Sequence, residues 1–130
     1  MINKIKISLV FLFILFITNN FSQKKLDPWI KLLKENNCIV SFIFYSKADN
    51  YNNGIVIKIE NKNKFTIRYR FTIIAKIETV EKEKIFKGEL TAVEIRTGSN
   101  NNLFWIPELK GKSIAEIGIK KWKFYKPKYK

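Results

Sequence analysis

Apolar and polar residues alternate along much of the chain with a period of two, the pattern of half-buried β-strands. The clearest example runs from Phe65 to Thr79, where the odd positions as far as Ile77 are apolar and most even ones are polar. Strands usually run about 3 to 10 residues, so this long pattern is expected to bend or change partner midway, at Ile74. Residues 54–60 alternate in the same way, and residues 61–64 predict a turn between the two strands.

Other segments predict further strands. Residues 38–47 read CIVSFIFYSK and are apolar on both alternating faces, which indicates a strand buried on both sides. After an exposed charged segment at 81–84, short strands are expected at 85–86 and 90–95, separated by Gly88. Residues 98–102 predict a second turn, and the next strand, 103–106, ends at Pro107 because proline cannot donate to a ladder.

The last strand contains a change of register. Ala115, Ile117 and Ile119 form one apolar row, after which the row continues one position out of step at Trp122 and Phe124. A slip of one residue is what a β-bulge produces, so we expect a bulge at Lys120–Lys121.

One short helix is expected before these strands. Asp27 fits the N-cap and Pro28 the first helical position, where a missing N–H costs nothing. Trp29, Ile30 and Leu33 would then share one face, and residues 36–37 would end the helix. A helix of about ten residues is marginal alone, so its apolar side is expected to cover the strand at 38–47.

The first residues have the layout of a secretory signal peptide, with Lys4 and Lys6 before an apolar run from Leu9 to Ile17. This run is much shorter than the roughly 20 residues of a membrane-spanning helix, so a retained anchor is the disfavoured alternative. We expect residues 1–22 to be removed, leaving 23–130 as one domain without a transmembrane anchor, in the periplasm or outside the cell.

About seven strands with turn signals between them predict an all-β fold, an antiparallel β-sandwich, with a small barrel as the alternative. The hairpin GIVIKIENKNKFTIRYRF and the segments FKGEL and TGSNNNLFWIP resemble the immunoglobulin-like domains of small secreted bacterial proteins. The resemblance covers most of residues 38–125. It implies an immunoglobulin-like sandwich and a tendency toward binding or assembly roles, without the paired cysteines of antibody-type domains.

Composition removes most catalytic chemistry. The chain has no histidine, which excludes Ser–His and Cys–His nucleophiles, and one cysteine, Cys38, which excludes an intrachain disulfide. We expect Cys38 to be a small buried hydrophobic residue. No glycine-rich phosphate loop or calcium-type carboxylate cluster is present. The expectation is a protein that is not an enzyme and holds no cofactor or metal, with a two-carboxylate hydrolase as the alternative.

The formal net charge of +14 suggests anionic partners, such as an acidic glycan or the phosphates of lipopolysaccharide. Arginine, whose fixed fork of donors suits specific readout of phosphates and bases, occurs only at Arg68, Arg70 and Arg96. Specific nucleic-acid recognition is therefore not expected, and a solubilising lysine coat is the alternative reading of the charge.

The C-terminal segment 120–130 alternates lysines with aromatic rings, which can stack on sugars beside cations that hold phosphates. The candidate binding residues are Lys120, Lys121, Trp122, Lys123, Tyr125 and Lys126. Alternatively, Trp122 and Phe124 fill the core while the lysines protect a sheet edge. Two hypotheses follow: an exported module that binds or assembles with another envelope protein, and a binder of acidic glycan or lipopolysaccharide. The sequence leaves the partner and the oligomeric state open.

Overall fold

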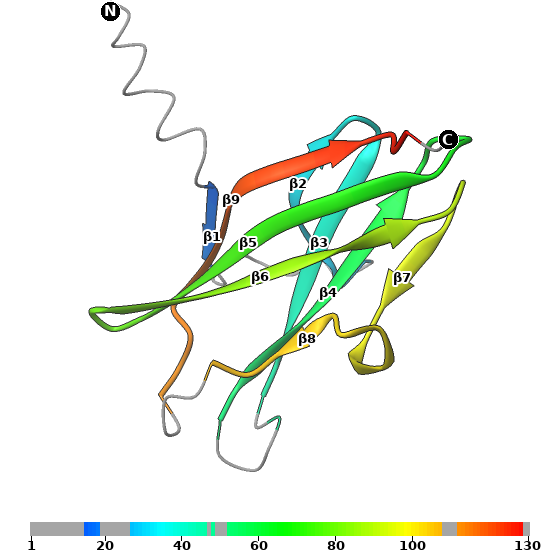
Figure 1. Ribbon diagram of the computed structural model, residues 1–130. Coiled ribbons are helices and arrows are strands. Elements are labelled where there is room, and N and C mark those ends of the chain that lie inside the picture. Colours follow the sequence, from blue (N-terminus) through cyan, green and yellow to red (C-terminus); the bar gives the residue numbers. More distant parts are fainter. Residues whose placement is uncertain (1–14, 19–26, 47, 49–51, 108–111, 129–130) are drawn as a thin grey trace, which may run out of the picture.

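The computed structural model describes residues 15–18, 27–46, 48, 52–107 and 112–128, which form two antiparallel sheets (Figure 1). Sheet A has the strand order β1 (Leu15–Thr18), β9 (Glu116–Tyr125), β5 (Ile67–Ile77) and β6 (Val80–Leu90). Sheet B has the order β2 (Ile30–Glu35), β3 (Cys38–Tyr45), β4 (Gly54–Asn61) and β7 (Ile95–Thr97), and β8 (Phe104–Trp105) also pairs with β4. A 3₁₀ turn, Ser99–Asn101, lies between β7 and β8.

One hydrophobic core joins the two sheets. It includes Phe71 and Ile119 of sheet A and Phe42 and Ile57 of sheet B, all fully buried. The predicted all-β sandwich is therefore confirmed at the level of two separate, facing sheets. The expected burial of Cys38 is also confirmed: its side chain lies in this core, and burial raises the pKa of the thiol although a hydrogen bond from Asn63 acts in the opposite direction.

The alternating row of β5 is confirmed, since every odd-numbered residue from Ile67 to Ile77 is buried. Phe65 is the exception, because it precedes the strand and is 39% exposed. The expected change of partner at Ile74 is wrong, and the alternative of a bend there stays a prediction. β5 pairs with β6 along its whole length, and its one irregularity, against β9, lies opposite Phe71.

That irregularity is the predicted β-bulge. Arg70 lies opposite Lys123 and Thr72 opposite Lys120, so β9 contains one more residue than β5 over this interval. Lys121 takes up the extra length with a positive φ of 52°. The bulge brings Phe124 into the core, in agreement with the sequence pattern.

The expected helix is wrong. Residues 30–35 form the strand β2, because Asn36 and Asn37 both adopt positive φ and turn the chain directly back into β3. Two such residues make the tight hairpin turn that matches the twist of paired strands. Asp27 does not cap a helix; its Oδ1 accepts a hydrogen bond from the Trp29 N–H at 3.1 Å. The helix expected to cover β3 is thus absent from the described residues, and Tyr45 is 53% exposed.

The expected division of residues 81–95 is also wrong. Residues 81–84 are exposed as predicted, but they belong to β6, which continues without a break through Gly88 to Leu90. β6 is an edge strand whose backbone pairs with β5 residue by residue, so charged side chains can remain in solvent while the ladder continues. A separate strand, β7, begins only at Ile95.

The predicted leader lies mostly outside the described residues. Positions 15–18 are described, and they form β1 at the edge of sheet A. Across the part of the chain described, no helix has the length and apolar character needed to cross a membrane.

Candidate functional site

The outer face of sheet A carries three adjacent cations. Arg70 in the middle strand lies directly opposite Lys87 of β6 on one side and Lys123 of β9 on the other, and all three residues are exposed. We call these three residues the cationic row. Neighbouring strands are roughly 4.8 Å apart, so like charges opposite one another repel. Among the described residues, no carboxylate forms an ion pair with any member of the row.

The next position along the strands is occupied by Tyr125, Arg68 and Glu89, again side by side on β9, β5 and β6. Arg68 donates two hydrogen bonds to Glu89 Oε2, at 3.1 Å from Nε and 2.7 Å from Nη2. The oxygens of Glu89 and then of Tyr125 raise the pKa of Arg68, which keeps this guanidinium charged. Glu89 is therefore engaged by Arg68 at the border of the cationic row.

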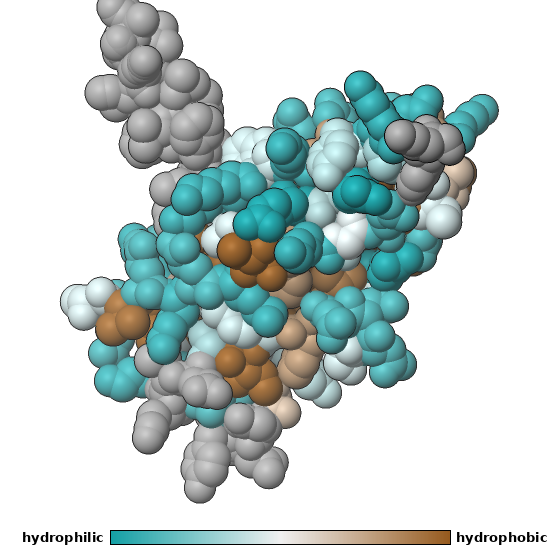
Figure 2. Space-filling model, viewed as in Figure 1, coloured by the Kyte–Doolittle hydropathy of each residue, from teal (hydrophilic) through white to brown (hydrophobic). Residues whose placement is uncertain are grey.

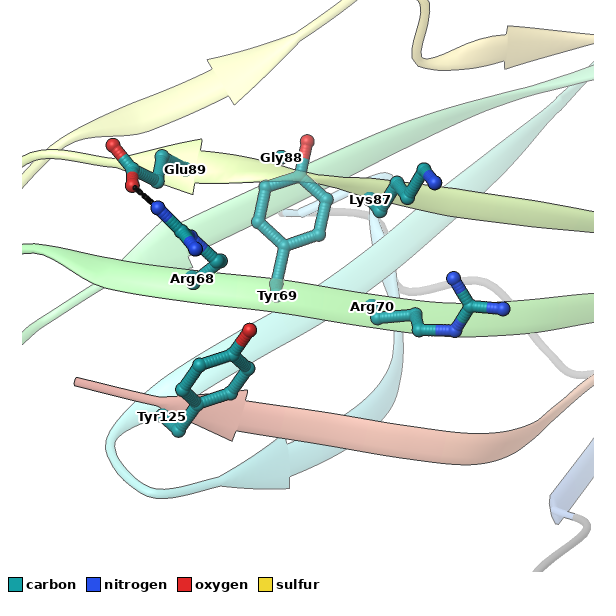
Figure 3. Close-up of a pocket in the computed structure, with 7 residues that line it drawn as sticks. All are labelled: Arg68, Tyr69, Arg70, Lys87, Gly88, Glu89 and Tyr125. Atoms are coloured by element: carbon teal, nitrogen blue, oxygen red, sulfur yellow. Dashed lines mark hydrogen bonds and ion pairs between the residues drawn. The ribbon is translucent and has the colours of Figure 1, made fainter. Parts of the chain in front are cut away.

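A shallow groove of about 410 Å³ joins these two sets of residues (Figure 3). Tyr69 and Gly88, an opposed pair on β5 and β6, also line it. In Figure 3, Arg70 and Lys87 extend on one side of Tyr69, and the Arg68–Glu89 pair lies on the other. A Cβ at Gly88 would lie 2.8 Å from the Tyr69 hydroxyl oxygen, so glycine is what allows the phenol to lie against β6. Burial raises the pKa of Tyr69, so its phenol is neutral at physiological pH.

A second groove, of about 450 Å³, lies at the end of the sandwich. It is lined by the amide residues Asn36, Asn37 and Asn63 and by Phe65, Ile67, Phe124, Tyr125 and Lys126. The Lys126 ammonium lies 4.7 Å from the centre of the Phe65 ring. Tyr125, which is 41% exposed, lines both grooves and so offers an aromatic ring between a cationic and an amide-rich surface.

The six residues predicted from the C-terminal segment do not share one surface. Lys123 and Tyr125 lie on the outer face, and Lys126 lines the end groove. Lys120 is also on the outer face, but its ammonium lies 2.6 Å from Glu83 Oε2. Lys121 forms the bulge, and Trp122 packs against the core.

Sequence reasoning missed Arg68, Arg70 and Lys87 as site residues. The alternating pattern of residues 65–79 did place both arginines on the polar face of one strand, and this was the signal that could have identified them as site residues. It could not show that Lys87 and Lys123 would lie on either side of Arg70, because that depends on the register of two separate ladders.

The outer face as a whole is hydrophilic, with small hydrophobic areas between the polar side chains (Figure 2). Away from the cationic row its charges are paired. Lys76 lies between Glu81 and Glu116, at 3.8 and 3.7 Å. This pairing leaves the cationic row as a local excess of positive charge, which suits the binding of anionic groups.

In the described part of the chain, no three residues of the types His, Cys, Asp and Glu lie closely enough together to hold a metal ion.

Comparisons of the chain with protein-family models, with curated proteins and with solved structures give no match.

Proposed function

We propose that this protein is an exported, non-enzymatic binding module that recognises an acidic glycan through the outer face of sheet A. The observation that carries this proposal is the cationic row, in which Arg70 lies between Lys87 and Lys123. A ligand with phosphate, sulfate or carboxylate groups would relieve the repulsion within the row. The phosphorylated glycan of lipopolysaccharide is one such ligand.

The partly exposed ring of Tyr125 favours a sugar polymer, rather than a simple anion, as the ligand. This ring adjoins both grooves, and aromatic faces stack well on the apolar faces of sugars. The ligand would place acidic groups over the cationic row and a sugar ring over Tyr125.

Export and an immunoglobulin-like topology belong to the same proposal. The signal-peptide layout of residues 1–22 supports export. Two facing antiparallel sheets support an immunoglobulin-like sandwich, whereas the meander β2–β3–β4 within sheet B differs from the Greek-key order typical of that fold.

The test compares two charge reversals on the same strand and face. Arg70→Glu places a carboxylate in the cationic row, and Lys76→Glu makes the same change of charge where carboxylates already flank the site. Affinity for heparin and for lipopolysaccharide is measured by calorimetry at low salt, with neutral dextran as the blank. We expect Arg70→Glu to weaken binding at least about tenfold and Lys76→Glu to change it less than about twofold.

Equal losses of affinity in the two variants would show that the whole basic surface binds non-specifically. Unchanged binding by Arg70→Glu would show that the cationic row is not the binding site. Preference for lipopolysaccharide over heparin, or the reverse, identifies the source of the acidic groups.

A further inference from the structure

Strand β1 lies inside the predicted leader, yet it completes the edge of sheet A beside β9 (Figure 1). Its register is antiparallel, with Leu15 opposite Ile119, Ile17 opposite Ile117 and Thr18 opposite Glu116. Removal of residues 1–22, which is the export step of the proposed function, would also remove this strand. The edge of β9 would then expose unpaired backbone N–H and C=O groups, which readily accept another strand.

We propose that a second copy of this chain takes the place of β1 after the leader is removed. The two β9 strands would pair antiparallel across residues 116–120 about a twofold axis at Gly118. This interface is isologous, so each contact occurs twice.

The segment 116–120 is complementary to itself in this register. Centring the pair on Gly118 places Glu116 of one copy opposite Lys120 of the other, which brings together opposite charges on the outer face. Ile117 then lies opposite Ile119 of the second copy. Both isoleucines are fully buried in the full chain, where β1 places apolar residues at the same two positions. The second copy would therefore place isoleucines at the two register positions that Leu15 and Ile17 occupy in the full chain.

The bulge sets the length of the pairing. Lys121 has a φ of 52°, which interrupts the regular strand immediately after Lys120. The ladder between two copies is thus limited to five residues by the chain itself.

Such a dimer would extend sheet A across both copies. A twofold axis perpendicular to the sheet keeps the two outer faces on the same side, so two cationic rows would share one surface. A long acidic polymer could then contact both rows, and its avidity would exceed its affinity for one copy.

The first experiment compares the full chain with a chain that starts at Gln23, by sedimentation over a range of concentrations. We expect the shorter chain to dimerise and the full chain to remain monomeric. Circular dichroism and protection of the β5 amides from hydrogen exchange show whether each chain is folded. A shorter chain that is folded but monomeric, with freely exchanging amides at 116–119, would overturn the inference, as would equal dimerisation of both chains.

The second experiment is a charge exchange in the shorter chain. Glu116→Lys and Lys120→Glu each place like charges opposite one another twice per dimer, and each is expected to weaken dimerisation about tenfold. The double variant restores opposite charges and is expected to dimerise within about twofold of the parent chain. Each residue also has a partner within its own copy, Lys76 for Glu116 and Glu83 for Lys120, so folding is checked for every variant.

Lys82→Glu is the matched control, because it makes the same charge change on β6, two strands away from the proposed interface. A double variant no better than the single ones would contradict the proposed register. The two proposals can fail separately. If the shorter chain is monomeric but binds heparin normally, only the dimer is contradicted. If it dimerises but binds no anion, only the glycan site is contradicted.

Discussion

The two ends of the outer face of sheet A use the same three strands but arrange their charges in opposite ways. At one end Lys76 of β5 lies between Glu81 of β6 and Glu116 of β9. At the other end Arg70 lies between two lysines. The outer face of sheet A therefore carries an excess of positive charge at one end and balanced charges at the other. A coat of lysines that served solubility alone would not require this separation.

The core beneath the two ends differs as well. Under the cationic row lie aromatic rings, with Phe71 at 5.6 Å from Phe86 and 6.2 Å from Phe124 between ring centres. Under the balanced end lie aliphatic residues, including Ile77 and Ile117. The surface proposed to bind the glycan thus lies over large, flat side chains with few rotamers, which provide a rigid support.

The largest expected effect comes from removing that support. Phe71→Ala should destabilise the protein by about 3 to 5 kcal/mol, because it removes a fully buried ring that packs against the rings of Tyr69, Phe86 and Phe124. Ile73→Val, on the same strand and face, should cost only about 0.5 to 1.5 kcal/mol. Denaturant unfolding measures both values. Similar costs for the two variants would argue against a special role for the aromatic end.

The second prediction concerns the change in stability after charge reversal. The sign of this change should differ between the two ends. Arg70→Glu should stabilise the fold by about 1 kcal/mol, because two repulsive pairs become attractive. Lys76→Glu should destabilise it by a similar amount, since three carboxylates would then lie side by side. Thermal unfolding at low salt gives both values. Shifts of the same sign would contradict the opposite charge arrangements inferred for the two ends.

The third prediction uses salt to separate charge from packing. Arg70→Gln should weaken heparin binding about fivefold at 0.01 M salt, where the screening length is about 30 Å. The difference from the parent protein should disappear near 1 M salt, where this length falls to about 3 Å. A difference that persists at high salt would mean that Arg70 contributes through contacts other than charge.

The smallest expected effect comes from breaking the ion pair between Arg96 and Glu94. Arg96 donates to Glu94 at 2.7 Å. Burial opposes ionisation of Glu94, but hydrogen bonds from Thr91 and Arg96 together outweigh it and lower the pKa of this carboxyl. Its contribution to stability is complete above the pKa of the unfolded chain and is lost as the pH falls through the folded value. Glu94→Gln should therefore cost less than about 1 kcal/mol at pH 7, and this cost should shrink as the pH falls through the lowered pKa of Glu94. A cost independent of pH would show that the pair acts through geometry alone.

Several elements could be predicted because their signals are local. The alternation in β5 identified its buried row, and the slip between Ile119 and Trp122 identified the bulge in β9. The helix prediction failed because Asn36 and Asn37 are compatible both with the end of a helix and with a tight hairpin turn. Pairing with β3 decided between them, and six residues have too little helical stability of their own to resist that pairing.

By itself, the sequence determined that this protein is built of β-strands, which side of β5 faces the core, and that Arg68 and Arg70 project from the opposite side. Only the tertiary structure decided which residues stand beside those arginines. The neighbours of Arg70 depend on the turn that registers β6 against β5 and on the bulge that shifts β9. Because side chains alternate along a strand, a slip of one residue in either ladder would move a different residue beside Arg70. No local pattern records the register of β5 against β9, which lies far along the chain.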